Sequence, residues 1–161
     1  MKIKCLFALL LLSPSLLVAA TELAYVTNEK DDNISVIDLT QQKVIKEIPV
    51  GQRPRGIIFN HDQSLAYICA SDSDRIQILD LATEEIVGEL PSGEDPETIA
   101  LHPNGKIIYT SNEDDAILTV IDIATSEVIA QIDVGVEPEG LAVSPDGKIV
   151  VVTSEPIWST G

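Results

Sequence analysis

The charged residues with the most regular spacing follow a proline that recurs every 42 residues. The residue after each proline is charged, and the first copy carries an additional arginine just before it. Side chains of both signs in one register can bind a polar ligand, or they can simply solvate turns. Both interpretations stay open at this point. The candidate ligand-binding residues are Arg53, Arg55, Glu97 and Glu139.

Short acidic runs form a second group of candidates. Neighbouring carboxylates can supply oxygen ligands to calcium, which takes roughly six to eight of them. None of these runs has the glycine at the sharp turn or the terminal glutamate of a helix-loop-helix calcium site. Solvated turns are therefore the interpretation we favour over a metal site. The candidate metal-binding residues are Asp31, Asp32, Asp72, Asp74, Asp114 and Asp115.

Other residue types that could do chemistry are isolated. Cys69 has no second cysteine outside the N-terminal segment to pair with, so we expect a buried, inert thiol. His61 and His102 occupy different positions of the repeat and are expected in turns. The sequence contains no nucleophile elbow, phosphate-binding glycine loop or metal-binding helix motif. It therefore predicts no catalytic residue and no cofactor.

A 42-residue repeat positions all of these residues. Tyr25, Tyr67 and Tyr109 define one column, and further columns of the same period contain glycine, proline and aliphatic residues. Four short β-type runs in each unit favour propeller blades over helical repeats, which would show a 3.6-residue apolar rhythm. One acidic column follows two apolar residues, and we expect it to accept hydrogen bonds at the next turn. Its members are Asp38, Asp80 and Asp122.

The second unit shows the four predicted strands most clearly, at residues 56–59, 65–70, 75–81 and 85–90. Residues 102–105 and 144–147 have proline second and glycine fourth, which is typical of a type I turn closing a hairpin. Residues 60–63 lack both and predict a weaker turn. The apolar runs are nearly continuous, as expected for sheets that are packed on both faces.

The sequence therefore predicts an all-β fold of four-stranded antiparallel propeller blades, with thirteen strands in an incomplete ring of about 3.4 repeats. The partial propeller is expected over residues 21–155, followed by a non-repeat tail at 156–161. Because rings usually close with more blades, we expect a truncated chain, either genuine or from a frameshift. The predicted blade parts are 24–50, 55–92, 97–134 and 139–155.

The tetrapeptide Tyr25-Val26-Thr27-Asn28 is the one after which the YVTN family of β-propeller repeats is named, and residues 109–112 form a degenerate copy. Segments 50–54 and 143–147 also resemble that family, so the likeness covers nearly all of residues 24–155. Within it, the chain most resembles the β-propeller proteins associated with pyrroloquinoline-quinone-dependent alcohol catabolism. Haem-binding nitrite reductase and lactonase propellers are also similar, but none of their haem-ligating or catalytic motifs can be placed here.

The resemblance implies a non-enzymatic binding or scaffold propeller that supports quinoprotein alcohol oxidation. The alternative is a fragment of a propeller enzyme, either a lactonase-like hydrolase or a cofactor-bound oxidoreductase. A surface-layer array is a third class, which more repeats and a wall anchor would favour. The ligand or protein partner is not identified by the sequence, and self-association through open blade edges is expected.

The charge and the N-terminal segment indicate the compartment. The 161 residues include 26 acidic and 10 basic side chains, a net charge of −16, which disfavours nucleic acid and anionic lipid as partners. Residues 1–20 combine a basic start, a short apolar core and small residues before Thr21, the pattern of a cleaved signal peptide. An uncleaved anchor is the alternative. We expect a periplasmic or secreted protein without membrane contact after cleavage.

Overall fold

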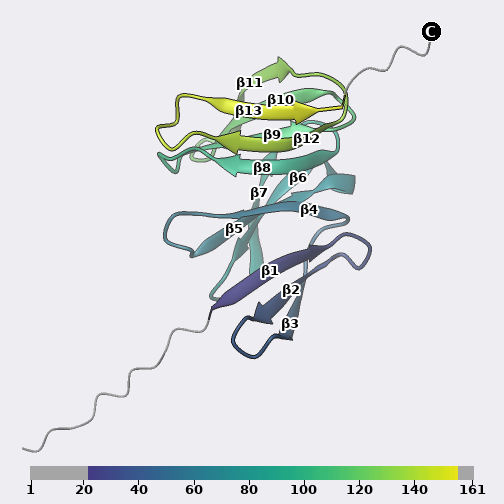
Figure 1. Cartoon of the computed structure of the whole chain (residues 1–161), viewed down its shortest axis with the longest axis vertical. Helices are drawn as coiled ribbons and strands as arrows, with labels where there is room; N and C mark the ends of the chain where they lie inside the picture. The colour runs from purple at the N-terminus through teal and green to yellow at the C-terminus, as the bar shows by residue number, and fades with distance from the viewer. Residues whose placement is uncertain (1–21, 156–161) are drawn as a thin grey trace, which may run out of the picture.

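The computed structural model describes residues 22–155 as four antiparallel β-sheets that lie side by side without closing a ring (Figure 1). The expected signal peptide, its cleavage site before Thr21 and the tail at 156–161 lie outside the described residues. The predicted fold class is confirmed: the chain is all-β and its sheets are arranged as propeller blades.

The first two sheets take up the chain as far as Pro91. The first is three-stranded, and the second is four-stranded with all its strands in sequence order. Their strands are β1 (Leu23–Asn28), β2 (Asn33–Asp38), β3 (Lys43–Pro49), β4 (Pro54–Phe59), β5 (Leu65–Ala70), β6 (Arg75–Asp80) and β7 (Glu85–Pro91), with the short 3-10 helix η1 (Ser71–Ser73) after β5.

The third sheet repeats this order and the fourth has two strands. Thirteen strands are present in residues 22–155, as predicted, and those of the second sheet begin and end within two residues of the expected positions. The remaining strands are β8 (Pro96–Leu101), β9 (Ile107–Asn112), β10 (Ile117–Asp122), β11 (Glu127–Asp133), β12 (Pro138–Val143) and β13 (Val150–Ser154).

Two apolar clusters hold the sheets together, and β5 belongs to both. Its alternate side chains point to opposite faces of the sheet. Ile68 packs with Ile34 of the first sheet, whereas Tyr67 and Cys69 pack with Ile99 and other residues of the third. This double burial explains why the apolar runs do not alternate with polar residues. Cys69 is fully buried, as expected, and burial raises the pKa of its thiol to about 12.

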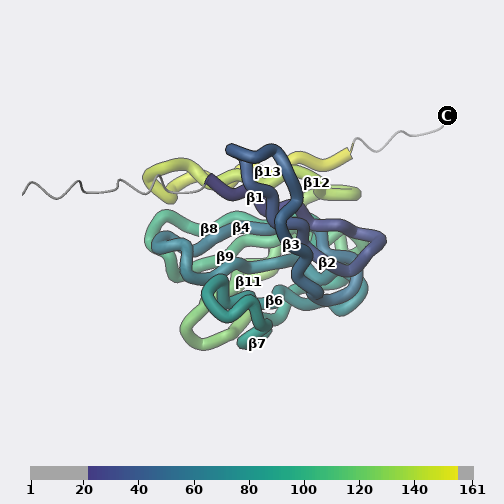
Figure 2. Tube along the Cα trace, turned by 90° about the horizontal axis from the view of Figure 1, so that it is seen from below, coloured from purple at the N-terminus to yellow at the C-terminus, as the bar shows by residue number. Residues whose placement is uncertain are grey.

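The loops between strands use left-handed backbone at a regular interval. One series, on the face where the inner strands β4, β8 and β12 begin, recurs every 21 residues and consists of Asp32, Arg53, Asp74, Asp95, Ala116 and Glu137. A second series with the same interval occupies the other loops: Gln42, Gln63, Glu84, Gly105, Ser126 and Gly147. Each blade is therefore built from two hairpin halves with equivalent corners. Figure 2 shows the chain from one end of the stack, so that the loops of successive sheets overlap in the view.

The turns between inner and second strands agree with the sequence patterns. The amide of Gly105 donates to the carbonyl of His102 at 2.8 Å, and Gly147 repeats this contact with Ser144. The turn at residues 60–63, predicted to be weaker, closes in the same way at 3.1 Å with Gln63 at a φ of 58°. This turn has no proline or glycine to favour its conformation. The Asn60 side chain stabilises it instead by accepting hydrogen bonds from the amides of Ser64 and Leu65. His61 and His102 lie in these turns, as expected.

The acidic column at the ends of the third strands caps the following turns, as predicted. Asp38 accepts the amide of Gln41 at 2.8 Å, and Asp80 accepts the amides of Ala82 and Thr83, also at 2.8 Å. Asp122 makes the same pair of contacts with the amides of Ala124 and Thr125. These backbone donors hold the pKa values of Asp38 and Asp80 below the usual range for aspartate.

Candidate functional site

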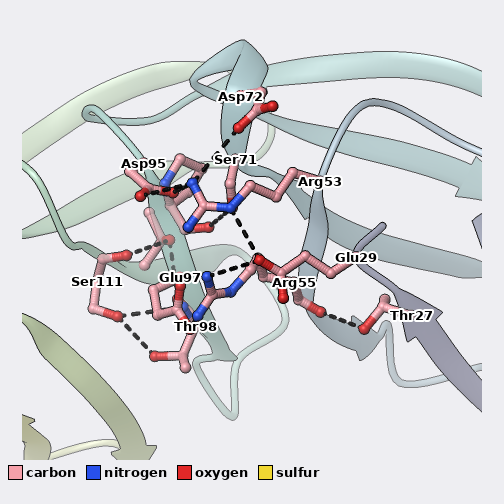
Figure 3. A network of polar contacts seen from close by, with 12 residues as sticks. Thr27, Glu29, Arg53, Arg55, Ser71, Asp72, Asp95, Glu97, Thr98 and Ser111 are labelled. Atoms are coloured by element: carbon pink, nitrogen blue, oxygen red, sulfur yellow. Dashed lines mark hydrogen bonds and ion pairs between the residues drawn. The ribbon is translucent and has the colours of Figure 1, made fainter. Parts of the chain in front are cut away.

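A charged cluster forms where the inner strands begin. Arg53 lies in the loop before β4 and Arg55 is the second residue of that strand. Asp95 and Glu97 occupy the corresponding positions of β8, and Glu29 follows β1. Because β4 and β8 are neighbouring inner strands, a repeat distance of 42 residues becomes a side-chain contact (Figure 3).

The loops that carry these residues are fixed by carboxylates of the preceding loop. The amide of Arg53 donates to Asp32 at 2.9 Å, and the amide of Asp95 donates to Asp74 at 3.0 Å. Asp115 accepts the amide of Glu94 at 2.7 Å. Three of the six loop carboxylates singled out as candidate metal ligands therefore act as acceptors that hold the next inner strand in position.

The other three candidate metal ligands behave differently. Asp72 lies 3.5 Å from Arg53 as an ion pair, with half of its side chain exposed. Asp31 and Asp114 are exposed. Within residues 22–155, the one group of three carboxylates whose oxygens lie within 4.8 Å of one another is Asp95, Glu97 and Glu113, and none of these was among the predicted metal residues.

Arg53 is the most heavily paired residue of the cluster. Its Nη1 lies 3.1 and 3.0 Å from the two oxygens of Asp95, and its Nε lies 3.1 Å from Glu29 Oε1. These contacts raise the pKa of the Arg53 guanidinium, led by the hydrogen bond to Glu29. The same bond lowers the pKa of Glu29. Both groups are charged at neutral pH.

Arg55 joins the same network from β4. Its Nη2 donates to Glu97 Oε1, and its Nη1 lies 3.3 Å from Glu29 Oε1. The backbone carbonyl of Arg55 accepts the hydroxyl of Thr27 at 2.8 Å, which ties β4 to the first sheet. Figure 3 shows both guanidiniums between Glu29 on one side and Asp95 and Glu97 on the other.

Glu97 and Asp95 are the most buried carboxylates of the cluster, with 8% of each residue exposed. Glu97 is the one with an unpaired oxygen. Its Oε2 is buried and has no hydrogen-bond partner. Burial raises the pKa of Glu97, and the neighbouring Arg55 only partly opposes this shift. The arginine pair therefore does not satisfy the whole carboxylate.

Three of the four predicted ligand-binding residues thus come together, namely Arg53, Arg55 and Glu97. Glu139 is exposed at the start of β12 and forms no ion pair with a lysine or arginine within residues 22–155. The sequence interpretation missed Glu29 and Asp95. The signal for Asp95 was present, because it lies in the same repeat column as Arg53 with the opposite charge.

An open pocket of about 340 Å³ adjoins the cluster, lined by Thr27, Glu29, Arg55, Glu97 and Thr98 among others. It lies beside the inner strands β4 and β8 and the end of β1. A second pocket of about 310 Å³ lies between the first two sheets and is lined mainly by Leu23, Tyr25, Phe59 and Leu81. Charged side chains line only the first of these two, which is therefore the better candidate for a polar ligand.

Comparison with known proteins agrees with this architecture. Residues 61–147 match the family model described as a YNCE-like beta-propeller. The chain belongs to this family. No curated protein matches the sequence. Among the residues described, no helix has the length and apolar character needed to cross a membrane.

Solved structures are similar to the chain in fold. One similar chain comes from Kuenenia stuttgartiensis hydrazine synthase, with 25% identity, a TM-score of 0.76 and coverage of 84% of this chain and 39% of that one. Another is a functionally unknown protein from Desulfotomaculum acetoxidans, with 20% identity, a TM-score of 0.64 and coverage of 76% and 42%. The chain spans about two fifths of the length of these structures.

Proposed function

We propose that this chain is part of an exported, non-enzymatic β-propeller that binds a cationic partner at the charged cluster of its inner strands. The observation that carries the proposal is the imbalance of charge in the cluster. Arg53 and Arg55 face an excess of carboxylates, contributed by Glu29, Asp72, Asp95, Glu97 and Glu113. A net negative field there attracts cationic groups.

The charge of the whole chain supports the same class of partner. With a net charge of −16, long-range steering favours a basic protein surface or a cationic small molecule and opposes nucleic acid. The pocket beside Arg55 and Glu97 offers room for a cationic side chain. Self-association belongs to the proposal as well, because β13 carries an exposed apolar side chain, Val151, on a two-stranded sheet.

Two parts of the proposal are based on the sequence alone: export from the cytoplasm and a role in alcohol oxidation. Export follows from the leader-like pattern of residues 1–20, and support of quinoprotein alcohol oxidation follows from the resemblance to proteins associated with that catabolism. The second candidate function is a fragment of a propeller enzyme. The similarity to a chain of hydrazine synthase favours this candidate, because that protein bears the name of an enzyme.

Binding of a lysine-rich peptide tests the proposal. Fluorescence anisotropy of a labelled oligolysine should rise on addition of the full chain, and Glu29→Gln should weaken the binding. Glu127→Gln is the matched control, because it removes the same charge from an exposed position at the start of β11. If both substitutions weaken peptide binding equally, the binding depends on the overall charge of the chain and the proposed site is wrong.

Turnover measurements separate the two candidate functions. The full chain should not hydrolyse lactones above the background rate. Hydrolysis that disappears on substitution of Arg55 would instead favour the enzyme fragment.

A further inference from the structure

At two positions of the 42-residue repeat, the side-chain charge changes from positive to negative along the stack of blades. The first contains Arg53, Asp95 and Glu137, and the second contains Arg55, Glu97 and Glu139. Between β4 and β8 each column places an arginine against an acid. Between β8 and β12, which are also neighbouring inner strands, the same columns place acid against acid. The chain thus lacks a cation of its own where the first junction has two.

Three of the acidic side chains converge on the third blade itself. Asp95, Glu97 and Glu113 each offer an oxygen, and these oxygens lie within 4.8 Å of one another. Asp95 and Glu97 are each 8% exposed and are paired with Arg53 and Arg55, so water does little to screen the additional negative charge of Glu113. Glu113 follows β9 and forms no ion pair with a lysine or arginine among residues 22–155.

One atom shows independently that this group is incomplete. Glu97 Oε2 is buried and accepts no hydrogen bond, although Oε1 of the same carboxylate is paired with Arg55. Buried polar atoms without a partner are rare in folded proteins, and each one calls for a water or an ion. The surroundings of Glu137 are also negatively charged. The carboxylates of Glu155, Glu113 and Glu139 raise the pKa of Glu137.

We propose that Asp95, Glu97 and Glu113 bind a calcium ion in the third blade, where β8 begins and β9 ends. All three ligands are carboxylate oxygens, which calcium prefers, and the group contains no histidine or cysteine that would favour zinc. Water completes the coordination. Calcium tolerates irregular geometry and several carboxylates, whereas magnesium requires a near-ideal octahedron and retains most of its water. This inference rests on the same negative cluster as the proposed function, because the ion uses three of its carboxylates. Calcium binding and oligolysine binding are separate measurements, so either proposal can fail alone.

Calorimetric titration of the full chain with calcium chloride at neutral pH tests the site. We expect a dissociation constant of about 10⁻⁴–10⁻³ M, the range of extracellular calcium modules. Glu113→Gln should weaken binding about tenfold or more, because it removes a charged ligand. Asp114→Asn is the matched control: it neutralises the next residue of the same loop, which is exposed and outside the group, and should leave the affinity unchanged.

Thermal unfolding provides a second measurement. It also shows whether a substitution has altered the stability of the variant itself. Calcium should raise the Tm of the wild type more than sodium chloride of equal ionic strength, and this difference should be lost in Glu113→Gln. Absence of both heat and a calcium-specific Tm shift would overturn the site. Equal loss of affinity in Glu113→Gln and Asp114→Asn would also overturn it, because the effect would then be diffuse charge screening.

Discussion

The Arg55–Glu97 contact is a largely buried ion pair between two blades. Glu97 has 10% of its side chain exposed and Arg55 has 23%. Such a pair stabilises a fold little compared with apolar residues, but removing one partner leaves a desolvated charge. The effect of each residue on stability is therefore best tested by single and double substitution.

Arg55→Met should lower the free energy of unfolding by about 2–4 kcal/mol, because Glu97 would remain buried without a cation. The double variant Arg55→Met/Glu97→Met should recover much of this loss. Denaturant unfolding measures both values. Lys46→Met is the control, since Lys46 pairs with Glu84 at the surface and should change stability by less than about 1 kcal/mol. A double variant no more stable than the single one would contradict the prediction.

Stability should fall at acidic pH through the aspartates that cap the turns. The pKa values of Asp38 and Asp80 are lower in the folded state than their ordinary value. Their contribution is therefore present above the ordinary aspartate pKa, and it is lost as the pH falls through the folded value. Unfolding curves recorded between neutral pH and about pH 2 should show a smaller acid-induced loss for Asp80→Ser than for the wild type. An unchanged pH profile would argue against a stabilising cap.

At the scale of the elements, the left-handed corners are occupied mainly by residues with side chains. A left-handed conformation costs about 1–2 kcal/mol for an ordinary residue and almost nothing for glycine. Aspartate at these corners has a compensating role, because Asp32 and Asp74 accept the amides of the next inner strand. Ala116, at a φ of 55°, has no side-chain group that could do this.

Ala116→Gly should therefore raise the free energy of unfolding by about 0.5–1 kcal/mol. Ala130→Gly, in the middle of β11, is the control and should lower stability by a similar amount. Thermal or denaturant unfolding distinguishes the two directions. Destabilisation by Ala116→Gly would show that the corner depends on a contact of the alanine methyl group.

Periodicity made the elements predictable. Columns of tyrosine, proline and aspartate every 42 residues were enough to predict the number of strands, the turns and the capping role of Asp80, because each depends on local backbone chemistry. The charge cluster was only partly predictable. Arg53, Arg55 and Glu97 were singled out from their column, but Glu29 and Glu113 join them through the position of the preceding loop in space, which no repeat column expresses.

For the molecule as a whole, burial is concentrated in the middle of the stack. Both apolar clusters draw on the second sheet, with members from the first and third. The fourth sheet is more exposed, because Pro138 is the one buried residue of β12 and β13. Repeat proteins gain stability from each unit and from each interface between units, so the sheets are not equally stable.

Hydrogen exchange should reveal this gradient. Amides of β5, β6, β9 and β10 should be the most protected, and those of β12 and β13 should exchange fastest among the strands. Mass spectrometry of the full chain after brief deuteration measures the difference. Uniform protection across residues 24–155 would mean that the stack unfolds as one cooperative unit.

The 21-residue interval between left-handed corners also bears on how such a chain can grow. The two hairpin halves of a blade have the same left-handed corners, but they differ in burial. All but one residue of β5 are buried, whereas only one residue of β7 is. A duplication or deletion of 21 residues would keep every corner in phase while exchanging an inner hairpin for an outer one, which would place exposed residues in the core. A duplication or deletion of 42 residues replaces each strand by the equivalent strand of a neighbouring blade. Gene duplication can therefore lengthen this protein by whole blades, and half a blade is a step that folding would reject.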